Sequence, residues 1–486
     1  MRRFLAILAM FFLAGPALSQ SEIPAEPVAE PVAEPVEDYL DRAMPAASAP
    51  GLAWAILDNG RICSGVRGAL IVGSGQPVTD DTAFPLGSIS KGFTALAIMQ
   101  QVEAGRLELD GAIADYLELF EGQPGASVTI RQLLGHTSGY STLQGNETGP
   151  GPDGEPDTLA ARVRQLARTA PAREAGTSWQ YSNANYLILG ALVEALSGLD
   201  YARYVETRIL DPLGMDDSFV GGSDRGANAV VSRGHTPWFG GRRPLVAADQ
   251  TRGDPMAPAG GIMGSAADVA RYLAMMMNGG DDLITAEHKA MMLQPASPLA
   301  PHYGLGWSLD VNSDMAFHTG LVPGAEAIAV LSPSQQRGGV VLVNANSGMG
   351  FGVTGDILMG MSALALGDEP GRGGRHLGTQ SLYLMPVALL ILFLAGTVTA
   401  WLRRDGLRAK SGVAGAFSLF FPVLATLAMA WVFVDLMPKL FGAPLMTFNL
   451  YQPDMVILLV ASSVTGVGFA LFRLILAYTG RGSSAA

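Results

Sequence analysis

The stretch Gly87-Ser88-Ile89-Ser90-Lys91-Gly92-Phe93-Thr94-Ala95-Leu96-Ala97-Ile98-Met99 places a serine at the start of a predicted apolar helix. Lys91 follows Ser88 by three residues, so one helical turn brings the hydroxyl and the amine to the same face. Backbone N–H groups at a helix start can also stabilise a developing negative charge. Ser88 is therefore the candidate nucleophile and Lys91 its proton partner. A helix-capping serine followed by a solvated lysine would give the same spacing, so this motif alone leaves both interpretations open.

Two further motifs carry groups that a serine nucleophile needs. Tyr181-Ser182-Asn183 supplies a phenol that can move a proton and an amide that can orient the lysine or a substrate. His318-Thr319-Gly320-Leu321 follows a predicted strand, where Gly320 permits close approach and the N–H of Leu321 can point into an oxyanion hole. Each motif is weak alone, but chance gives all three together in only about 1% of such chains.

The order of these motifs resembles that of the serine β-lactamase-related family, which includes class C β-lactamases, D-alanyl-D-alanine carboxypeptidases and β-lactamase-like esterases. The flanking phrases Leu133–Gly139, Gly176–Trp179 and Ala259–Asp268 are also similar. The resemblance covers about residues 38–365. It implies an α+β fold of the β-lactamase/DD-peptidase type, in which helices and a helical subdomain flank an antiparallel sheet.

The resemblance also implies roles for the site residues. An acyl donor would acylate Ser88, Lys91 and Tyr181 would share the proton transfers, and the N–H groups of Ser88 and Leu321 would hold the oxyanion. Asn183, His318, Thr319 and Gly320 would complete the substrate-binding side. Since Tyr and Lys both have a pKa near 10, we expect each to lower the pKa of the other.

His318 stands where β-lactamases and penicillin-binding enzymes usually carry a lysine. A mostly neutral imidazole pairs less well than an ammonium group with a substrate carboxylate. The sequence therefore favours an ester or a D-amino-acid peptide or amide as substrate over a β-lactam. A true β-lactamase and a catalytically inactive sensor of peptidoglycan or β-lactams are the alternatives.

The composition, 49% hydrophobic and only 15% charged, indicates membrane segments. Residues 1–19 are typical of an export signal, with a basic start, an apolar core and a small-residue cleavage site. Three apolar runs at about 381–401, 413–434 and 455–478 are long enough to span a bilayer. The basic loop 403–410 lies between the first two runs, which predicts a multi-pass inner-membrane protein with its catalytic domain on the periplasmic or extracellular side.

The export signal, the apolar runs and the extent of the family resemblance together predict the domain organisation. Residues 20–37 form an acidic Ala-Glu-Pro-Val linker expected to be extended, 38–367 the hydrolase domain, 368–380 a second linker and 381–486 the membrane region. We expect the strand hairpin 51–57 and 61–72 at the domain's start, and strands 303–311, 315–319, 325–332 and 338–344 near its end.

Other functional classes are disfavoured. The net charge of −12 argues against nucleic acid as a partner. The histidines show no metal-binding spacing and no phosphate or dinucleotide motif is present, so we expect neither metal nor cofactor. The partner is then a small-molecule or peptide substrate with an acyl group, for a membrane-embedded protein whose oligomeric state the sequence leaves open. His136 is expected to pack beneath the site.

Overall fold

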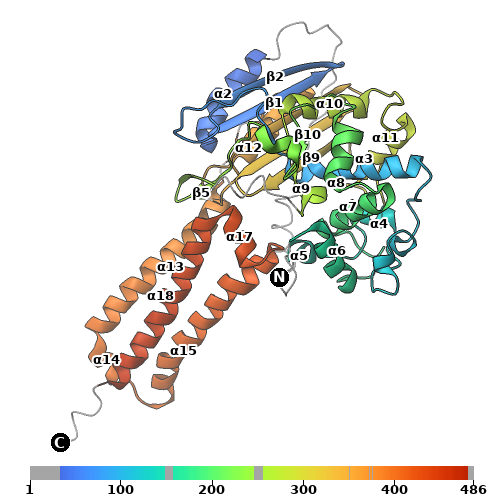
Figure 1. Ribbon diagram of the computed structural model, residues 1–486. Coiled ribbons are helices and arrows are strands. Elements are labelled where there is room, and N and C mark those ends of the chain that lie inside the picture. The colour runs from blue at the N-terminus through green and yellow to red at the C-terminus, as the bar shows by residue number, and fades with distance from the viewer. Residues whose placement is uncertain are drawn as a thin grey trace, which may run out of the picture.

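A six-stranded antiparallel sheet with helices on both faces forms one domain, from which three long helices extend (Figure 1). The computed structural model describes residues 33–147, 157–245, 255–349, 351–371, 373–374 and 376–479. The strand order is β2-β1-β11-β10-β9-β8, so strands from the beginning and the end of the domain pair at its centre. This is the predicted α+β architecture.

The strands bring distant segments into register. Those of the large sheet are β1 (Gly51–Asp58), β2 (Arg61–Gly68), β8 (Ser308–Leu309), β9 (Ala316–Val322), β10 (Ala325–Ser332) and β11 (Arg337–Val343). Two smaller sheets contain β3 (Phe84–Pro85), β4 (Phe219–Val220), β7 (Ile262–Gly264), β5 (His235–Trp238) and β6 (Gly241–Pro244). Leu52 of β1 pairs with Val343 of β11, which fixes the register between the first and last strands.

Side chains alternate across the sheet and bury both of its faces. Trp54 and Ile56 point toward a core shared with α2 and α12, whereas Ala53 and Ala55 point toward the larger core beneath α3 and α10. The domain's helices are α2 (Ala33–Ala47), α3 (Ser90–Glu103), α4 (Ile130–Leu134), α5 (Thr142–Glu147), α6 (Leu159–Arg168), α7 (Asn183–Ser197), α8 (Tyr201–Val205), α9 (Ala257–Gly260), α10 (Ala266–Met277), α11 (Ala286–Met292) and α12 (Gly355–Leu366).

The segment before residue 38 differs in part from its prediction. The predicted signal 1–19 and the linker up to residue 32 lie outside the described residues. The rest of that linker was wrongly expected to be extended, because Ala33–Glu37 belong to α2. Val36, fully buried, begins an apolar stripe that continues through Leu40 and Met44 against α12. Burial of this stripe outweighs the extended preference of the proline-spaced repeat.

The predicted strand 303–311 is also mostly wrong, since only Ser308–Leu309 forms β8. Gly306 adopts φ +82°, a conformation that folds the chain back, and Tyr303 is buried beside the site. In the first hairpin, Asn59 and Gly60 adopt the expected left-handed turn, but β2 ends at Gly68 rather than at residue 72.

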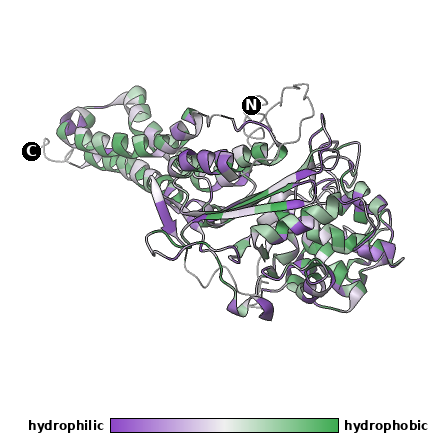
Figure 2. Cartoon of the chain, turned by 90° about the horizontal axis from the view of Figure 1, so that it is seen from above, coloured by the Kyte–Doolittle hydropathy of each residue, from purple (hydrophilic) through white to green (hydrophobic). Residues whose placement is uncertain are grey.

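Among the described residues, three helices near the C-terminus are long and apolar enough to cross a membrane, Leu377–Leu402, Gly412–Leu440 and Pro453–Tyr478. Figure 2 shows that they are coloured mainly as hydrophobic along their length. The first one begins inside the predicted linker 368–380, because hydropathy marks only the most apolar part of a helix. The individual elements are α13 (Leu377–Leu402), α14 (Arg404–Arg408), α15 (Gly412–Trp431), η7 (Val432–Leu436), α16 (Met437–Leu440), α17 (Leu445–Tyr451) and α18 (Pro453–Tyr478).

Candidate active site

Ser88 lies in a short 3-10 turn, η1 (Gly87–Ile89), that leads directly into α3. The preceding Gly87 has φ +54°, which turns the chain sharply before the serine. Ser88 itself is half-buried, whereas Lys91 in the first turn of α3 is completely buried. The Nζ atom of Lys91 lies 3.0 Å from the Oγ atom of Ser88, as the three-residue spacing predicts.

The Lys91 amine has two further partners, both neutral oxygens. It donates to Oδ1 of Asn183 at 2.8 Å and to the backbone oxygen of Ala259 at 2.6 Å. Its nitrogen also lies 4.9 Å from the centre of the Tyr181 ring. The structure thus brings three separate sequence motifs together around one amine. Ser88 and Lys91 come from η1 and α3, Asn183 from α7 and Ala259 from α9.

Burial among neutral groups sets the protonation of this cluster. It lowers the pKa of Lys91 well below the usual lysine value, and the described hydrogen-bond partners of the amine include no carboxylate that would oppose this effect. Tyr181 behaves in the opposite way to our expectation. Burial raises its pKa, and a hydrogen bond with Ser88 only partly offsets this effect. The prediction of mutual lowering is therefore wrong for Tyr181, which stays protonated while Lys91 readily becomes neutral.

His136 supports Tyr181 from below, in the position expected for it. Its ring centre lies 4.4 Å from that of Tyr181, and the side chain is buried. Nδ1 accepts hydrogen bonds from the backbone N–H of Ser182 at 3.2 Å and from Nδ2 of Asn185 at 2.9 Å. Because both donors fix the imidazole, His136 holds Tyr181 and the start of α7 in place.

Strand β9 forms the opposite side of the site. Gly320 passes so close to the nucleophile turn that a Cβ atom there would lie 2.0 Å from the backbone oxygen of Leu86. A Cβ atom on Gly87 would lie 2.8 Å from the backbone nitrogen of Leu321, so this nitrogen lies against the turn that carries Ser88. Since β8 pairs only with Ala316 and Phe317 of β9, the edge of β9 beyond these residues pairs with no other described strand.

His318 is buried and neutral rather than a cation facing the cleft. Burial and repulsion from Lys91 lower its pKa to about 3. Its Nδ1 lies 2.8 Å from the backbone oxygen of Thr319 and its Nε2 lies 3.1 Å from Oη of Tyr303. Nδ1 must therefore carry the proton, and Nε2 accepts the hydrogen bond from Tyr303. The side chain of Thr319 is exposed on the free edge of β9.

Sequence reasoning missed several groups. Tyr303 was assigned to a strand, and the backbone oxygen of Ala259 was recognised only as part of a flanking phrase. Asn146, whose Oδ1 accepts a hydrogen bond from Nδ2 of Asn183 at 3.0 Å, was not singled out at all. None has a motif of its own, and only the folded arrangement identifies them.

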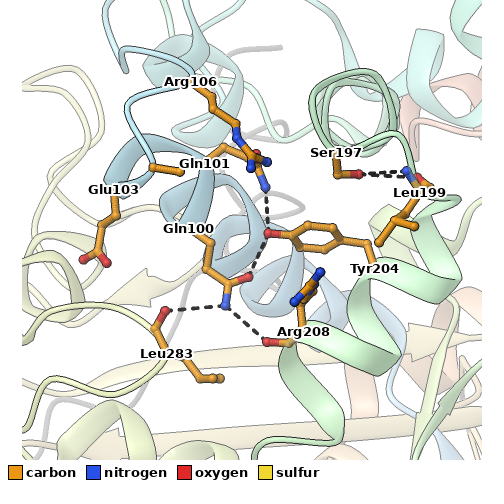
Figure 3. A pocket seen from close by; sticks show the side chains of 10 residues that line it. Gln100, Gln101, Glu103, Arg106, Ser197, Leu199, Tyr204, Arg208 and Leu283 are labelled. Atoms are coloured by element: carbon orange, nitrogen blue, oxygen red, sulfur yellow. Dashed lines mark hydrogen bonds between the residues drawn. The ribbon is translucent and has the colours of Figure 1, made fainter.

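A polar surface pocket of about 360 Å³ lies at the other end of α3 (Figure 3). Gln100, Arg106 and Tyr204 are among its lining residues, and none of the predicted site residues reaches it. About ten helical residues, or roughly 15 Å, separate it from Ser88. The hydroxyl of Tyr204 is hydrogen-bonded to the side chains of Gln100 and Gln101, so these polar groups of the pocket already have partners. The pocket is therefore separate from the reaction site.

Proteins similar to this chain include penicillin-binding proteins and a class C β-lactamase. Penicillin-binding protein 4 from Amycolatopsis lactamdurans is 30% identical over 288 residues, which cover 56% of this chain and 74% of that protein. The octameric penicillin-binding protein homologue from Pyrococcus abyssi superposes with a TM-score of 0.60 at 26% identity, covering 73% of this chain and 80% of its own. A class C β-lactamase shares the fold, with a TM-score of 0.56 at 21% identity over 70% of this chain and 97% of its own.

The match to the family covers one continuous range that includes all the residues predicted for the site. Residues 36–360 match the model of the Beta-lactamase family, from helix α2 through β11 and into α12. The matched range contains the serine, lysine and tyrosine around which the cluster is built. This chain therefore belongs to the Beta-lactamase family of serine hydrolases.

Proposed function

We propose that this protein is a membrane-anchored serine hydrolase that acts through a Ser88 acyl-enzyme on an ester or a D-amino-acid peptide or amide. The observation that carries the proposal is the set of contacts around Lys91. A buried neutral amine has two N–H groups and one lone pair. With its N–H groups donated to Ala259 and Asn183, the lone pair is left facing Oγ of Ser88 at 3.0 Å.

The acylation step follows from this arrangement. Ser88 Oγ attacks the substrate carbonyl carbon while its proton passes to Lys91. The new oxyanion is held by the N–H groups of Ser88 and Leu321. The bond from the carbonyl carbon to the leaving oxygen or nitrogen then breaks. The proton returns from Lys91 to the leaving group through the Tyr181 phenol, which hydrogen-bonds to Ser88. Water attacks the acyl-enzyme with the same proton route and releases the acid.

The state of His318 supports the substrate preference. A neutral imidazole that is already bonded to Tyr303 and Thr319 provides no charge for a substrate carboxylate. Acyl donors without a carboxylate at this position, such as esters and internal amides, therefore fit the site better than β-lactams do.

The arrangement of charges supports an extracytoplasmic catalytic domain. The domain lies at one end of the helix bundle, and the basic helix α14 lies at the other (Figure 1). Arg404 and Arg408 of α14 are therefore separated from the catalytic domain by the length of the membrane helices. Basic residues accumulate on the cytoplasmic side of membranes, so the catalytic domain would face the opposite side.

The test is covalent labelling of the full-length protein in detergent with a fluorophosphonate probe, followed by mass spectrometry. We expect one adduct on Ser88, absent from Ser88→Ala, and turnover of an ester or D-amino-acid amide at a higher kcat/KM than that of a penicillin. A folded protein without an adduct would refute the hydrolase proposal and favour the sensor. Faster turnover of the penicillin would refute the substrate preference.

A further inference from the structure

The connection between the second and third membrane helices reaches back to the catalytic domain. Helix α17 occupies this connection and lies at the domain end of the bundle, close to α5 (Figure 1). Asn146 of α5 donates a hydrogen bond from Nδ2 to the backbone oxygen of Gly442 at 2.9 Å. The same Asn146 accepts from Asn183, which in turn accepts from Lys91. A continuous hydrogen-bonded chain thus links the catalytic amine to the membrane region.

A second contact joins the same connection to Tyr181. A Cβ atom on Gly442 would lie 3.0 Å from Cγ2 of Thr142, whose hydroxyl donates to the backbone oxygen of Tyr181 at 2.5 Å. At the other end of α17, Tyr451 lies near enough to Tyr181 that its repulsion adds to burial in raising the pKa of that phenol. The turn that precedes α17 therefore lies beside the site, and Tyr451 ends the helix about 10 Å further along.

Polar contacts fix this segment to the domain. Oε1 of Gln452 accepts from the backbone N–H of Met349 at 3.0 Å, and Nδ2 of Asn346 donates to the backbone oxygen of Tyr451 at 3.1 Å. The buried carboxylate of Asp454 accepts from the backbone N–H of Phe239 at 2.9 Å. Because buried polar groups at this junction are paired across it, α17 has a defined position relative to the catalytic residues.

Helix α17 exposes an apolar face at the level where the bundle meets the domain. Met446 and Leu450 are four residues apart, share one face and are 77% and 54% exposed. Phe448 on another face packs against the apolar cluster around Met455 of α18. Since α17 connects two helices that are long and apolar enough to span a membrane, its exposed Met446 and Leu450 would face the adjoining leaflet.

We propose that α17 and its flanking turn, residues 441–452, form the membrane-side wall of the catalytic cleft. The acyl donor is then an amphiphile held in the leaflet, with its apolar chain along Met446 and Leu450 and its scissile carbonyl at Ser88. This inference rests on the proposed hydrolase function. The family match ends at residue 360, so the wall belongs to the region that this chain adds to the family domain.

The experiment compares two esters of one chromophore with the full-length protein in neutral phosphatidylcholine vesicles. 4-Nitrophenyl butyrate is largely soluble, and 4-nitrophenyl dodecanoate partitions into the bilayer. We expect the wild type to prefer the long ester after correction for partitioning. The double variant Met446→Ser/Leu450→Ser should lower the long-to-short ratio of kcat/KM about tenfold, because the apolar contacts of the chain are lost. Tyr451→Ala should lower the same ratio.

The matched control is Val311→Ser, which removes a similarly exposed apolar side chain, 63% exposed, from the turn between β8 and β9. It should leave the ratio unchanged. Normal Ser88 labelling and short-ester turnover without a long-ester preference would overturn this inference alone. An equal effect of the α17 variants on both esters, or the same loss in Val311→Ser, would also overturn it. Failure of labelling together with failure of both turnovers would refute the hydrolase function and the inference with it.

Discussion

Replacement of Gly320 by alanine tests whether the backbone of β9 forms one side of the oxyanion hole. The new Cβ atom would lie 2.0 Å from the backbone oxygen of Leu86, whereas ordinary van der Waals contact begins at about 3.4 Å. Strand β9 and the nucleophile turn must therefore separate by about 1.4 Å, the difference between these distances. A hydrogen bond of about 2.9 Å from Leu321 to the oxyanion would lengthen beyond useful range.

The loss of one oxyanion donor costs about 10²–10³-fold in kcat, and the strain costs about 1–3 kcal/mol of stability. The assay is steady-state ester hydrolysis by full-length Gly320→Ala, with thermal unfolding measured on the same preparation. Gly378→Ala is the control, since a Cβ atom there meets nothing within 4 Å. A folded Gly320→Ala protein with the kcat of the wild type would refute the assignment of β9 to the oxyanion hole.

Three further changes probe the proton-transfer groups. Lys91→Met should reduce acylation at least 10²-fold. The same variant should also raise the urea midpoint of unfolding, and by more at pH 7 than at pH 10. Burial lowers the pKa of Lys91 in the folded protein, so the lysine costs stability once the pH falls below the pKa of about 10.4 that it has in the unfolded chain. Equal shifts at both pH values would contradict the burial argument. For the wild type, kcat/KM should rise with pH through the lowered pKa of Lys91, as the amine becomes neutral. Tyr181→Phe should also lower acylation at least 10²-fold, and a rate near that of the wild type would remove the phenol from the proton route. His136→Ala should lower both kcat and the melting temperature, because the buried donors on Ser182 and Asn185 lose their acceptor at about 1–3 kcal/mol each; calorimetry and hydrolysis on one sample check both.

Local sequence was sufficient to predict the elements that form through interactions between neighbouring residues. The spacing of Ser88 and Lys91 places both groups on one turn whatever the rest of the chain does. The Asn59-Gly60 turn and the three long apolar helices described near the C-terminus follow in the same way from backbone preference and hydropathy. The start of α2 could not be predicted in this way, because Val36 is buried in a cluster with residues of α12, which lies more distantly in the sequence. The missed Tyr303 has the same cause, since its partner His318 comes from strand β9 and no local pattern links the two residues.

For the chemistry of the site, too, the sequence and the tertiary structure determined different properties. The sequence by itself determined which groups are available: a serine, a lysine, a tyrosine and an asparagine in the order of a known family, and a histidine in place of a usual lysine. Only the tertiary structure decided their protonation, because burial lowers the pKa of Lys91 and raises that of Tyr181. It alone also decided that Gly442 lies beside Asn146 and Thr142, since hundreds of residues separate Gly442 from them along the chain. Desolvation and long-range contact are properties of the packed molecule, and no local pattern of residues encodes them.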